Sequence, residues 1–290
     1  MYPATFDYLA PTSVEEALSI LAERGDEVKV LAGGQSLIPM MKLRFASPST
    51  LVDIGRLPGL SDIGETDGYL RLGALVRHND VVDSELVRRT NHTMTAAAPW
   101  IADPVVRNLG TIGGSLAHAD PEGDWASVVL ACGGEIVATS TTGERVVPVT
   151  EFIADMFTTT LRPDELLTEV RVPKYQGPAG GTYLKLERKI GDYATVAVAT
   201  HLELGGDGRI TNAGIALTSV APKNTKAIDA ERLLVGQLPG DELFAEAAEL
   251  AAQASDPKTD VRGPAEYKRD VVRVFVRRGL AKAAELASAA

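Results

Sequence analysis

Apolar residues at helical and strand spacing divide the N-terminal part of the chain into short elements. A helical pattern follows Ser13, which is a good N-cap, and Glu16 three residues later completes a capping box. Gly25 follows the end of this helix, and the apolar run Val28–Ala32 is typical of a short buried strand. The next predicted elements are a helix over Ser36–Arg44 and a strand over Thr50–Ile54. This order predicts a βαβ-like unit.

From about Gly59 the pattern changes to a mixture of strands and helices. Predicted strands cover Tyr69–Ala74, Glu135–Ser140 and Glu144–Val149, and predicted helices cover Val81–Arg89, Met94–Ile101 and Trp125–Ala131. The stretch Asp103–Asp124 is rich in Gly, Asn, Asp and Pro, and we expect it to lack regular structure. Loops of this length inside a domain are usually functional or disordered. The apolar residues within this one favour a function.

Pro and Gly clusters within Tyr175–Gly181 predict a boundary that separates residues 1–176 from residues 177–290. Antiparallel strands are predicted beyond it, over Thr182–Lys189, Thr195–Leu204 and Arg209–Val220. Helices are predicted to follow, over Thr225–Leu234, Asp241–Ala254 and Pro264–Ala287. The second part of the chain is therefore expected to be a sheet followed by helices.

Composition and charge exclude several classes of function. The chain of 290 residues is 45% hydrophobic and 23% charged, with a net charge of −10, which is ordinary for a globular protein. A nucleic-acid-binding role would need a basic stripe, and none is visible. The first residues lack the pattern of a signal peptide, and no apolar run approaches the roughly 18 residues of a membrane span. We expect a cytoplasmic protein, with peripheral association at the inner face of the membrane left open.

The single cysteine limits the cofactors that this chain can hold. Cys132 alone cannot form an internal disulfide, and an iron–sulfur cluster needs about four thiolates. A thiolate zinc site fails for the same reason, and the four histidines show no metal-ligand spacing. If the protein moves electrons, it must use an organic cofactor, and any metal belongs to a partner.

Two glycine pairs are the strongest candidates for a binding site. They lie in Ala32-Gly33-Gly34-Gln35-Ser36 and Thr111-Ile112-Gly113-Gly114-Ser115. Adjacent glycines at a strand end or in a loop suggest backbone that lies close to something that a side chain would block. A turn with positive φ before a helix forms a nest of amides for an anion, and the second segment offers further amides and two hydroxyls. No P-loop or Rossmann fingerprint is present, so a dinucleotide is predicted, and FAD and NAD remain alternatives.

Four runs of sequence carry a resemblance to a known family. The runs are AGGQSLIPMMKLR (32–44), RNLGTIGGSLAHADPEGDW (107–125), KLERKIGDYAT (185–195) and RGPAEYKRDVVRVFVRRGL (262–280). The chain resembles the flavoprotein subunits of molybdenum hydroxylases, and is most similar to the medium subunits of aerobic carbon monoxide dehydrogenases. Gln35 and Ser115 depart from the histidine and asparagine typical of that branch. Both changes keep a polar side chain.

The resemblance implies an α+β fold with a two-part FAD-binding region of the vanillyl-alcohol-oxidase type. FAD would lie between a small α/β lobe, about residues 1–56, and a larger α/β lobe, about residues 57–176. A C-terminal domain over residues 177–290 would contain a three-stranded antiparallel sheet and a helical bundle.

The implied function is electron transfer within a larger complex. A large subunit would hold the molybdenum cofactor and oxidise carbon monoxide with water to carbon dioxide, and a small subunit would pass electrons through 2Fe-2S clusters to FAD here. Reduced FAD would deliver them to an external acceptor such as a quinone. A dimer of heterotrimers is expected. Alternatives are a related large subunit that oxidises a purine, an N-heterocycle or an aldehyde, a stand-alone flavin oxidase, and a non-enzymatic nucleotide-binding module.

The glycine segments and the resemblance together give a set of expected cofactor contacts. They are Lys29, Val30, Leu31, Ala32, Gly33, Gly34, Gln35, Ser36, Leu37, Ile101, Ala102, Val106, Gly110, Thr111, Gly113, Gly114, Ser115, Ala117, His118, Asp120, Gly123, Asp124, Leu161, Lys185, Asp192 and Tyr193. No catalytic residue and no metal ligand is expected.

Individual roles follow for a few of these residues. Lys185 would place a positive charge near the pyrimidine end of the flavin, with Glu187 on the same strand face as its partner. Tyr193 would cover one flavin face. Asp124 would either accept a hydrogen bond from a cofactor hydroxyl or serve as a helix N-cap. His118 is expected to contact the cofactor through its backbone rather than to act as a base.

Overall fold

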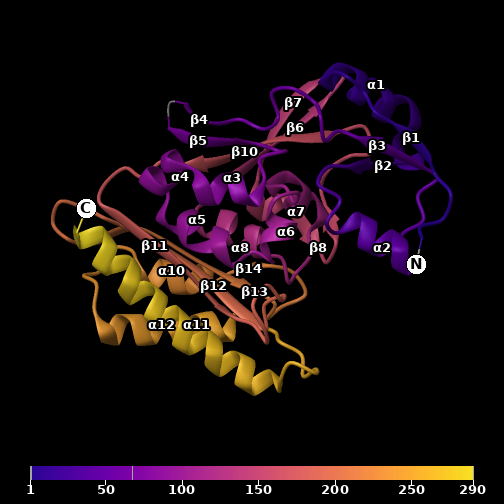
Figure 1. The fold of residues 1–290 in the computed structure, drawn as a ribbon. Helices are drawn as coiled ribbons and strands as arrows, with labels where there is room; N and C mark the ends of the chain where they lie inside the picture. The colour runs from indigo at the N-terminus through magenta and orange to yellow at the C-terminus, as the bar shows by residue number, and fades with distance from the viewer. Residues whose placement is uncertain (1, 67, 290) are drawn as a thin grey trace.

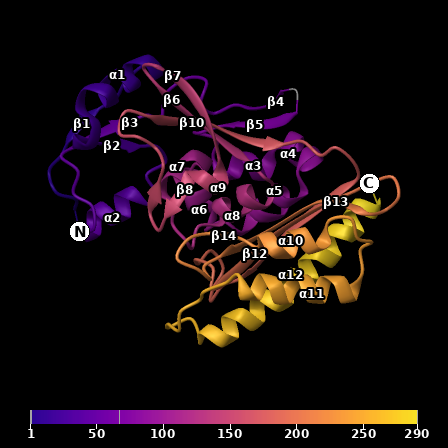
Figure 2. The ribbon, with the colours of Figure 1, turned by 180° about the vertical axis from the view of Figure 1, so that it is seen from behind.

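The computed structural model describes residues 2–66 and 68–289, and its main body has four layers. A five-stranded sheet, a layer of short helices, a second sheet and a final layer of long helices follow one another in both views (Figures 1 and 2). A small lobe formed by residues 2–54 stands beside the five-stranded sheet (Figure 1). The mixture of sheets and helices agrees with the α+β class.

The small N-terminal lobe is a three-stranded parallel sheet in the order β1-β3-β2. Its elements are β1 (Asp7–Leu9), α1 (Val14–Arg24), the 3₁₀ turn η1 (Gly25–Glu27), β2 (Val28–Leu31), α2 (Leu37–Leu43) and β3 (Thr50–Asp53). The Ser13 side chain caps α1 by accepting from the amide of Glu16, while the Glu16 carboxylate reaches Thr12 instead of Ser13. The predicted helices and strands of this lobe are confirmed, and β1 was not predicted.

The larger lobe contains an antiparallel sheet in the order β4-β5-β10-β6-β7. Its strands are β4 (Ile63–Thr66), β5 (Tyr69–Gly73), β6 (Glu135–Ser140), β7 (Gly143–Pro148) and the central β10 (Leu166–Pro173). A small hairpin, β8 (Ile153–Asp155) with β9 (Thr158–Thr159), lies beside it. The hairpin of β6 and β7 is confirmed, whereas β4, β10 and the small hairpin were not predicted.

Short helices fill the space between the two sheets. They are α3 (His78–Asp83), α4 (Glu85–Thr90), α5 (His92–Ala97), the 3₁₀ turn η2 (Ala98–Trp100), α6 (Pro104–Arg107), α7 (Ile112–His118), α8 (Asp124–Ala131) and α9 (Val149–Phe152). The helix predicted over Val81–Arg89 is two helices, because Ser84 ends the first and caps the second.

The expectation that Asp103–Asp124 lacks regular structure was wrong. This stretch contains α6 and α7, and the second glycine pair lies in the first turn of α7 rather than in a loop. Two long-range hydrogen bonds hold this turn, from the Ile112 amide to Val76 and from the Gly113 amide to Ala74. Tertiary contacts therefore form a helix that the local sequence disfavours.

The C-terminal sheet has the order β11-β12-β13-β14 and is antiparallel throughout. Its elements are β11 (Ala179–Leu186), β12 (Val196–Leu204), β13 (Ile210–Thr218), β14 (Thr225–Lys226), α10 (Ile228–Leu234), α11 (Asp241–Gln253) and α12 (Ala265–Ala289). Three long strands were expected, and the two-residue β14 is an addition at the start of a predicted helix.

Every residue of β12 is buried, because helices cover both faces of this sheet. Ala197 and Ala199 pack into the core that contains α5 and α8, while Val196 and Val198 pack into the core that contains α11 and α12. One face of the C-terminal sheet therefore contributes side chains to the first region of the chain. No helix among the described residues is both long enough and apolar enough to cross a membrane.

Candidate functional site

A cleft of about 820 Å³ lies between the small lobe, the larger lobe and the end of β11. The segments that line it include residues 28–37, 101–102, 110–124, 157–167 and 185–193. A volume of this size lies within the range of small-molecule and cofactor sites, roughly 300–1,000 Å³. The segments come from all three parts of the chain, as the interdomain site predicted from the sequence requires.

Every residue of the expected contact set lines this cleft except Val106. Val106 is half-buried on α6, and its carbonyl accepts the amide of Gly110 at 2.7 Å. It therefore shapes the turn before the second glycine pair without facing the cleft.

Both glycine pairs pack closely against backbone, Gly33 against the residues just before the second glycine segment and Gly113 against Ala74. A Cβ built on Gly33 would lie 2.0 Å from the carbonyl oxygen of Leu109, and one on Gly113 would lie 2.7 Å from the carbonyl oxygen of Ala74. These glycines are needed because protein backbone occupies the space beside them. The sequence correctly indicated a close approach, and the nearest neighbours at these two positions are protein backbone atoms.

The first glycine segment presents free amides to the cleft. None of the hydrogen bonds within residues 2–66 and 68–289 is donated by the amides of residues 33 to 36. Gly34 has a φ of +71°, so the segment turns through the left-handed region. Successive amides in such a turn form a concave nest for an anion. This nest fits the pyrophosphate of a dinucleotide.

The second glycine segment cannot supply amides in the same way. The Ile112 and Gly113 amides donate to Val76 and Ala74, and the Gly114 amide donates to the Thr111 hydroxyl at 3.1 Å. Neither glycine of this pair has a positive φ. The expectation of further free amides was therefore wrong at these positions.

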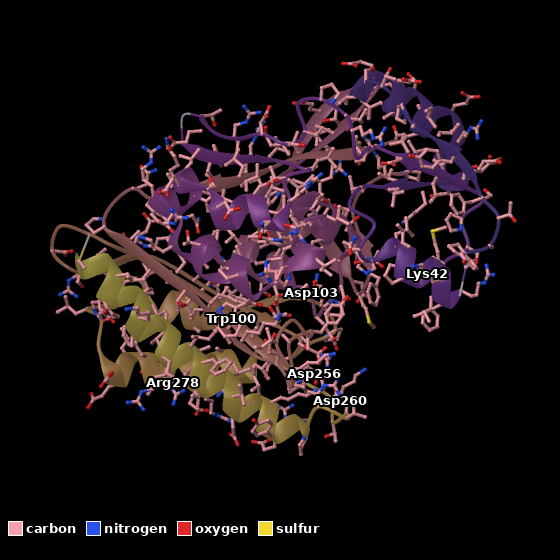
Figure 3. The ribbon with its side chains drawn as sticks, in the orientation of Figure 1. Lys42, Trp100, Asp103, Asp256, Asp260 and Arg278 are labelled. Atoms are coloured by element: carbon pink, nitrogen blue, oxygen red, sulfur yellow. The ribbon has the colours of Figure 1, made fainter. Side chains whose placement is uncertain are left out.

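A buried ion pair forms the wall of the cleft on the β11 side. The Lys185 ammonium donates to Asp124 Oδ2 at 2.9 Å and to the carbonyl of Trp100 at 3.0 Å. The predicted partner Glu187 is present 3.7 Å from the same nitrogen. Trp100 lies where the layer of short helices meets the C-terminal sheet (Figure 3). The ammonium is therefore fixed by three different segments.

Asp124 is not an N-cap, because Gly123 holds that position and Asp124 is the first residue of α8. Its Oδ1 accepts a hydrogen bond of 2.5 Å from the buried Tyr183 hydroxyl. Burial raises the pKa of Asp124, although Lys185 and Tyr183 act in the opposite direction. The N-cap alternative was wrong, and the protein partners of this carboxylate were not foreseen.

His78 lines the cleft and was missed by the sequence analysis. Its Nδ1 accepts from the Trp125 indole at 2.9 Å, which assigns the remaining ring proton to Nε2. Burial lowers its pKa to about 4, so the ring is neutral at physiological pH. A Cβ on Gly110 would lie 2.7 Å from Nε2, so the glycine makes room for this ring. A single histidine without metal spacing offered no signal for this role.

Arg262, from the C-terminal region, makes hydrogen bonds to residues at the rim of the cleft. Arg262 donates to Glu122 at 2.8 Å and to the carbonyl of Ala194 at 2.9 Å. Asp192 lies 3.8 Å from the same guanidinium, and Tyr193 beside it is 47% exposed at the mouth. Glu122 lines the cleft and was not predicted to do so.

Most of the cleft residues near the hairpin of β8 and β9 were not predicted from the sequence. Leu161 was expected there, but its neighbours Phe157, Thr159, Arg162 and Glu165 also line the cleft. Phe157 has a positive φ of 53° and packs against His118, with the two ring centroids 5.1 Å apart. These residues lie in an unpredicted hairpin or just after it, so no pattern in the sequence indicated them.

Two family models match the chain. Residues 4–175 match the FAD-binding domain in molybdopterin dehydrogenase, and residues 181–283 match the C-terminal domain of the carbon monoxide dehydrogenase flavoprotein. The chain belongs to the FAD-binding subunits of molybdopterin dehydrogenases. The free amides at residues 33 to 36 and the cleft between the lobes are the features that fit FAD in this family member.

Known relatives of this FAD-binding subunit match it along nearly its whole length. It is 39% identical to the 6-hydroxypseudooxynicotine dehydrogenase complex subunit alpha of Paenarthrobacter nicotinovorans, over 98% of this chain and 96% of that protein. It is also 39% identical to the carbon monoxide dehydrogenase medium chain of Hydrogenophaga pseudoflava, over 97% of each.

A solved structure of carbon monoxide dehydrogenase from Hydrogenophaga pseudoflava matches with a TM-score of 0.94. The sequence identity is 41%, and the match covers 98% of each chain. The fold expected from the resemblance is therefore confirmed.

Proposed function

We propose that this chain carries FAD as the electron-transfer subunit of a molybdenum hydroxylase complex, with carbon monoxide as the substrate of the large subunit. The nest of free amides at residues 33 to 36 is the observation that carries the cofactor assignment. When bound, FAD accepts electrons one at a time and passes them on. The similarity to carbon monoxide dehydrogenase medium chains supports the substrate.

Each part of the cleft has a proposed task towards FAD. Residues 33 to 36 would bind the pyrophosphate, and Asp120 and Ser115 would supply further polar contacts. Lys185 would hold a positive charge beside the flavin, and Tyr193 at the mouth would limit access by solvent and oxidants. The boundary at 176/177 and the lobes 1–56 and 57–176 are part of this proposal.

The metal centres would reside in partner subunits. Cys132 is buried and hydrogen-bonded to Asn91, and within the described residues no group of three or more His, Cys, Asp or Glu could hold a metal ion. A large molybdenum-cofactor subunit, a small 2Fe-2S subunit and a quinone acceptor complete the proposed electron path. The complex would be a dimer of heterotrimers in the cytoplasm.

A second candidate function is supported by one relative with the same sequence identity, 39%, as the carbon monoxide dehydrogenase medium chain. The similarity to a subunit of a 6-hydroxypseudooxynicotine dehydrogenase complex favours a large subunit that oxidises a nicotine-derived substrate. The chain described here would do the same work in either complex, because it only receives and delivers electrons.

Native purification of the complex tests both candidates. The purified material should contain flavin absorption that bleaches when carbon monoxide is added, with two further subunits present. Bleaching by 6-hydroxypseudooxynicotine and not by carbon monoxide would replace the first candidate with the second. Native protein without flavin would refute the cofactor assignment, and turnover of an organic substrate by the isolated chain would indicate a stand-alone oxidase.

A further inference from the structure

The buried cluster beside the cleft contains more negative than positive charge. The side chains of Lys185, Asp124 and Glu187 are 1%, 7% and 9% exposed. With all three ionised, one ammonium balances only one of two carboxylates. A buried carboxylate without its own cation is costly, so this cluster is poised to bind a proton.

The two carboxylates of the cluster differ in how many of their oxygens accept hydrogen bonds. Glu187 Oε1 accepts from the amide of Gly191 at 3.3 Å, while its Oε2 is buried and has no hydrogen-bond partner in the described part of the chain. Asp124 uses both oxygens, one for Tyr183 and one for Lys185. Burial and the adjacent Asp124 raise the pKa of Tyr183 well above its usual value, so the phenol stays a neutral donor.

Only part of this cluster faces the cleft. Asp124 and Lys185 line it, whereas Glu187 and Tyr183 do not. Asp124 is therefore the carboxylate of this cluster that borders the space available to a ligand. Like charges at short range raise the pKa of a carboxyl group, and burial already raises the pKa of Asp124.

The other charges near Asp124 do not offset this rise in its pKa. The loop before α8 contributes Asp120 and Glu122, which add negative charge. Tyr193 from the opposite rim is neutral, since burial raises its pKa. Arg262 is the nearby cation on that side, and it is already bonded to Glu122. Lys185 is therefore the cation in direct contact with Asp124.

We infer that the Asp124 carboxylate takes up a proton when the flavin is reduced, and releases it when the flavin is reoxidised. This inference rests on the proposed function, because it requires FAD in the cleft. FAD held in the cleft would supply a couple of two electrons and one proton, with the electrons coming from one-electron iron–sulfur donors and the proton from water. The Asp124 carboxylate takes a second proton from water and becomes a carboxylic acid.

Reoxidation completes the balance of protons and electrons. A quinone acceptor takes two electrons together with two protons, one from the reduced flavin and one from Asp124 by way of water. The flavin and the carboxylate then return to their starting states. Lys185 and Tyr183 act as positioning residues, since they hold the carboxylate beside the cleft without exchanging a proton.

The pH dependence of the flavin midpoint potential tests this inference in the flavin-loaded chain. Where the reduced flavin is an anion, the wild-type potential should fall more steeply with pH than that of Asp124→Asn. The two slopes should differ by the uptake of one proton per electron pair. This is a tenfold change in the reduction equilibrium constant per pH unit, or about 30 mV per pH unit for a two-electron couple. Asp83→Asn is the matched control, because it removes an exposed carboxylate on α3 that does not line the cleft, and it should keep the wild-type slope.

A measurement on the wild-type protein covers the case in which Asp124→Asn fails to fold or to hold flavin. The reduced-minus-oxidised infrared spectrum should show a protonated carboxyl band that shifts in deuterated water. Flavin-loaded protein without that band, or equal slopes in the wild type and Asp124→Asn, would overturn the inference. A chain that cannot be loaded with flavin at all would instead refute the proposed function.

Discussion

Replacing Gly33 by alanine tests whether contact between the two glycine segments sets the shape of the cleft. The added Cβ would lie 2.0 Å from the carbonyl oxygen of Leu109 and 2.9 Å from the Cα of Gly110. Ordinary contact begins at 3.4 Å, so one segment must move by about 1.4 Å. All of these neighbours are backbone atoms, so no flexible side-chain end can move aside.

The expected loss of stability in Gly33→Ala follows from overpacking. Forcing an extra carbon into a packed site costs about 1–3 kcal/mol. For a chain of this size, roughly 2–3 °C of Tm is lost per kcal/mol, so thermal unfolding should shift down by roughly 2–9 °C. The affinity for FAD should fall by about tenfold or more, since about 1.4 kcal/mol is one factor of ten and the displaced segment presents the free amides.

Thermal unfolding and FAD titration of the purified chain measure both effects. Gly64→Ala on the edge strand β4 is the control, because a Cβ there meets nothing within 4 Å and the residue has no positive φ. It should keep the wild-type Tm and FAD affinity. If Gly33→Ala matches Gly64→Ala in both measurements, the contact does not determine the shape of the cleft.

Three further variants or treatments probe other parts of the site. Lys185→Met leaves the buried Asp124 carboxylate without its cation, so the free energy of unfolding should fall by about 3–5 kcal/mol in a denaturant titration. Adding Asp124→Asn to this variant should restore part of the lost free energy. An unchanged free energy of unfolding in Lys185→Met would contradict the buried ion pair. The hydrogen bond from Arg145 lowers the pKa of Glu165 to about 2, below its ordinary 4.5, so this group stabilises the protein above pH 4.5 and that contribution is lost as the pH falls towards 2. Glu165→Gln should flatten the unfolding free energy across that window, and curves parallel to the wild type would count against the pairing. Burial raises the pKa of Cys132 to about 11, so a thiol reagent should react with it only after unfolding, and rapid reaction of the native protein would show that the site is open.

Elements with local signals were predictable. The N-cap at Ser13 and the left-handed Gly25 bound α1 as expected, because both are determined by residues within a few positions. The contact between Lys185 and Glu187 follows from strand alternation, which places residues two apart on one face. Most of the expected cofactor contacts belong to contiguous motifs, and all but Val106 line one cleft.

Features that depend on distant neighbours were not predictable. The central strand β10 was missed because a register shift between Leu167 and Glu169 breaks its alternation. The helix α7 was missed because glycines disfavour it locally, while Ala74 and Val76 hold its first turn from another segment. The bond between Asp124 and Lys185 joins residues 61 positions apart, and no local pattern indicates such a pair.

The position of β11 has a consequence for the order of events during synthesis. Asp124 becomes buried against Tyr183 and Lys185, which leave the ribosome about sixty residues later. Until then, a nascent chain has its first glycine segment but lacks the cation and the phenol that complete the wall of the cleft. The wall of the cleft is therefore completed only after the first strand of the C-terminal sheet has been translated.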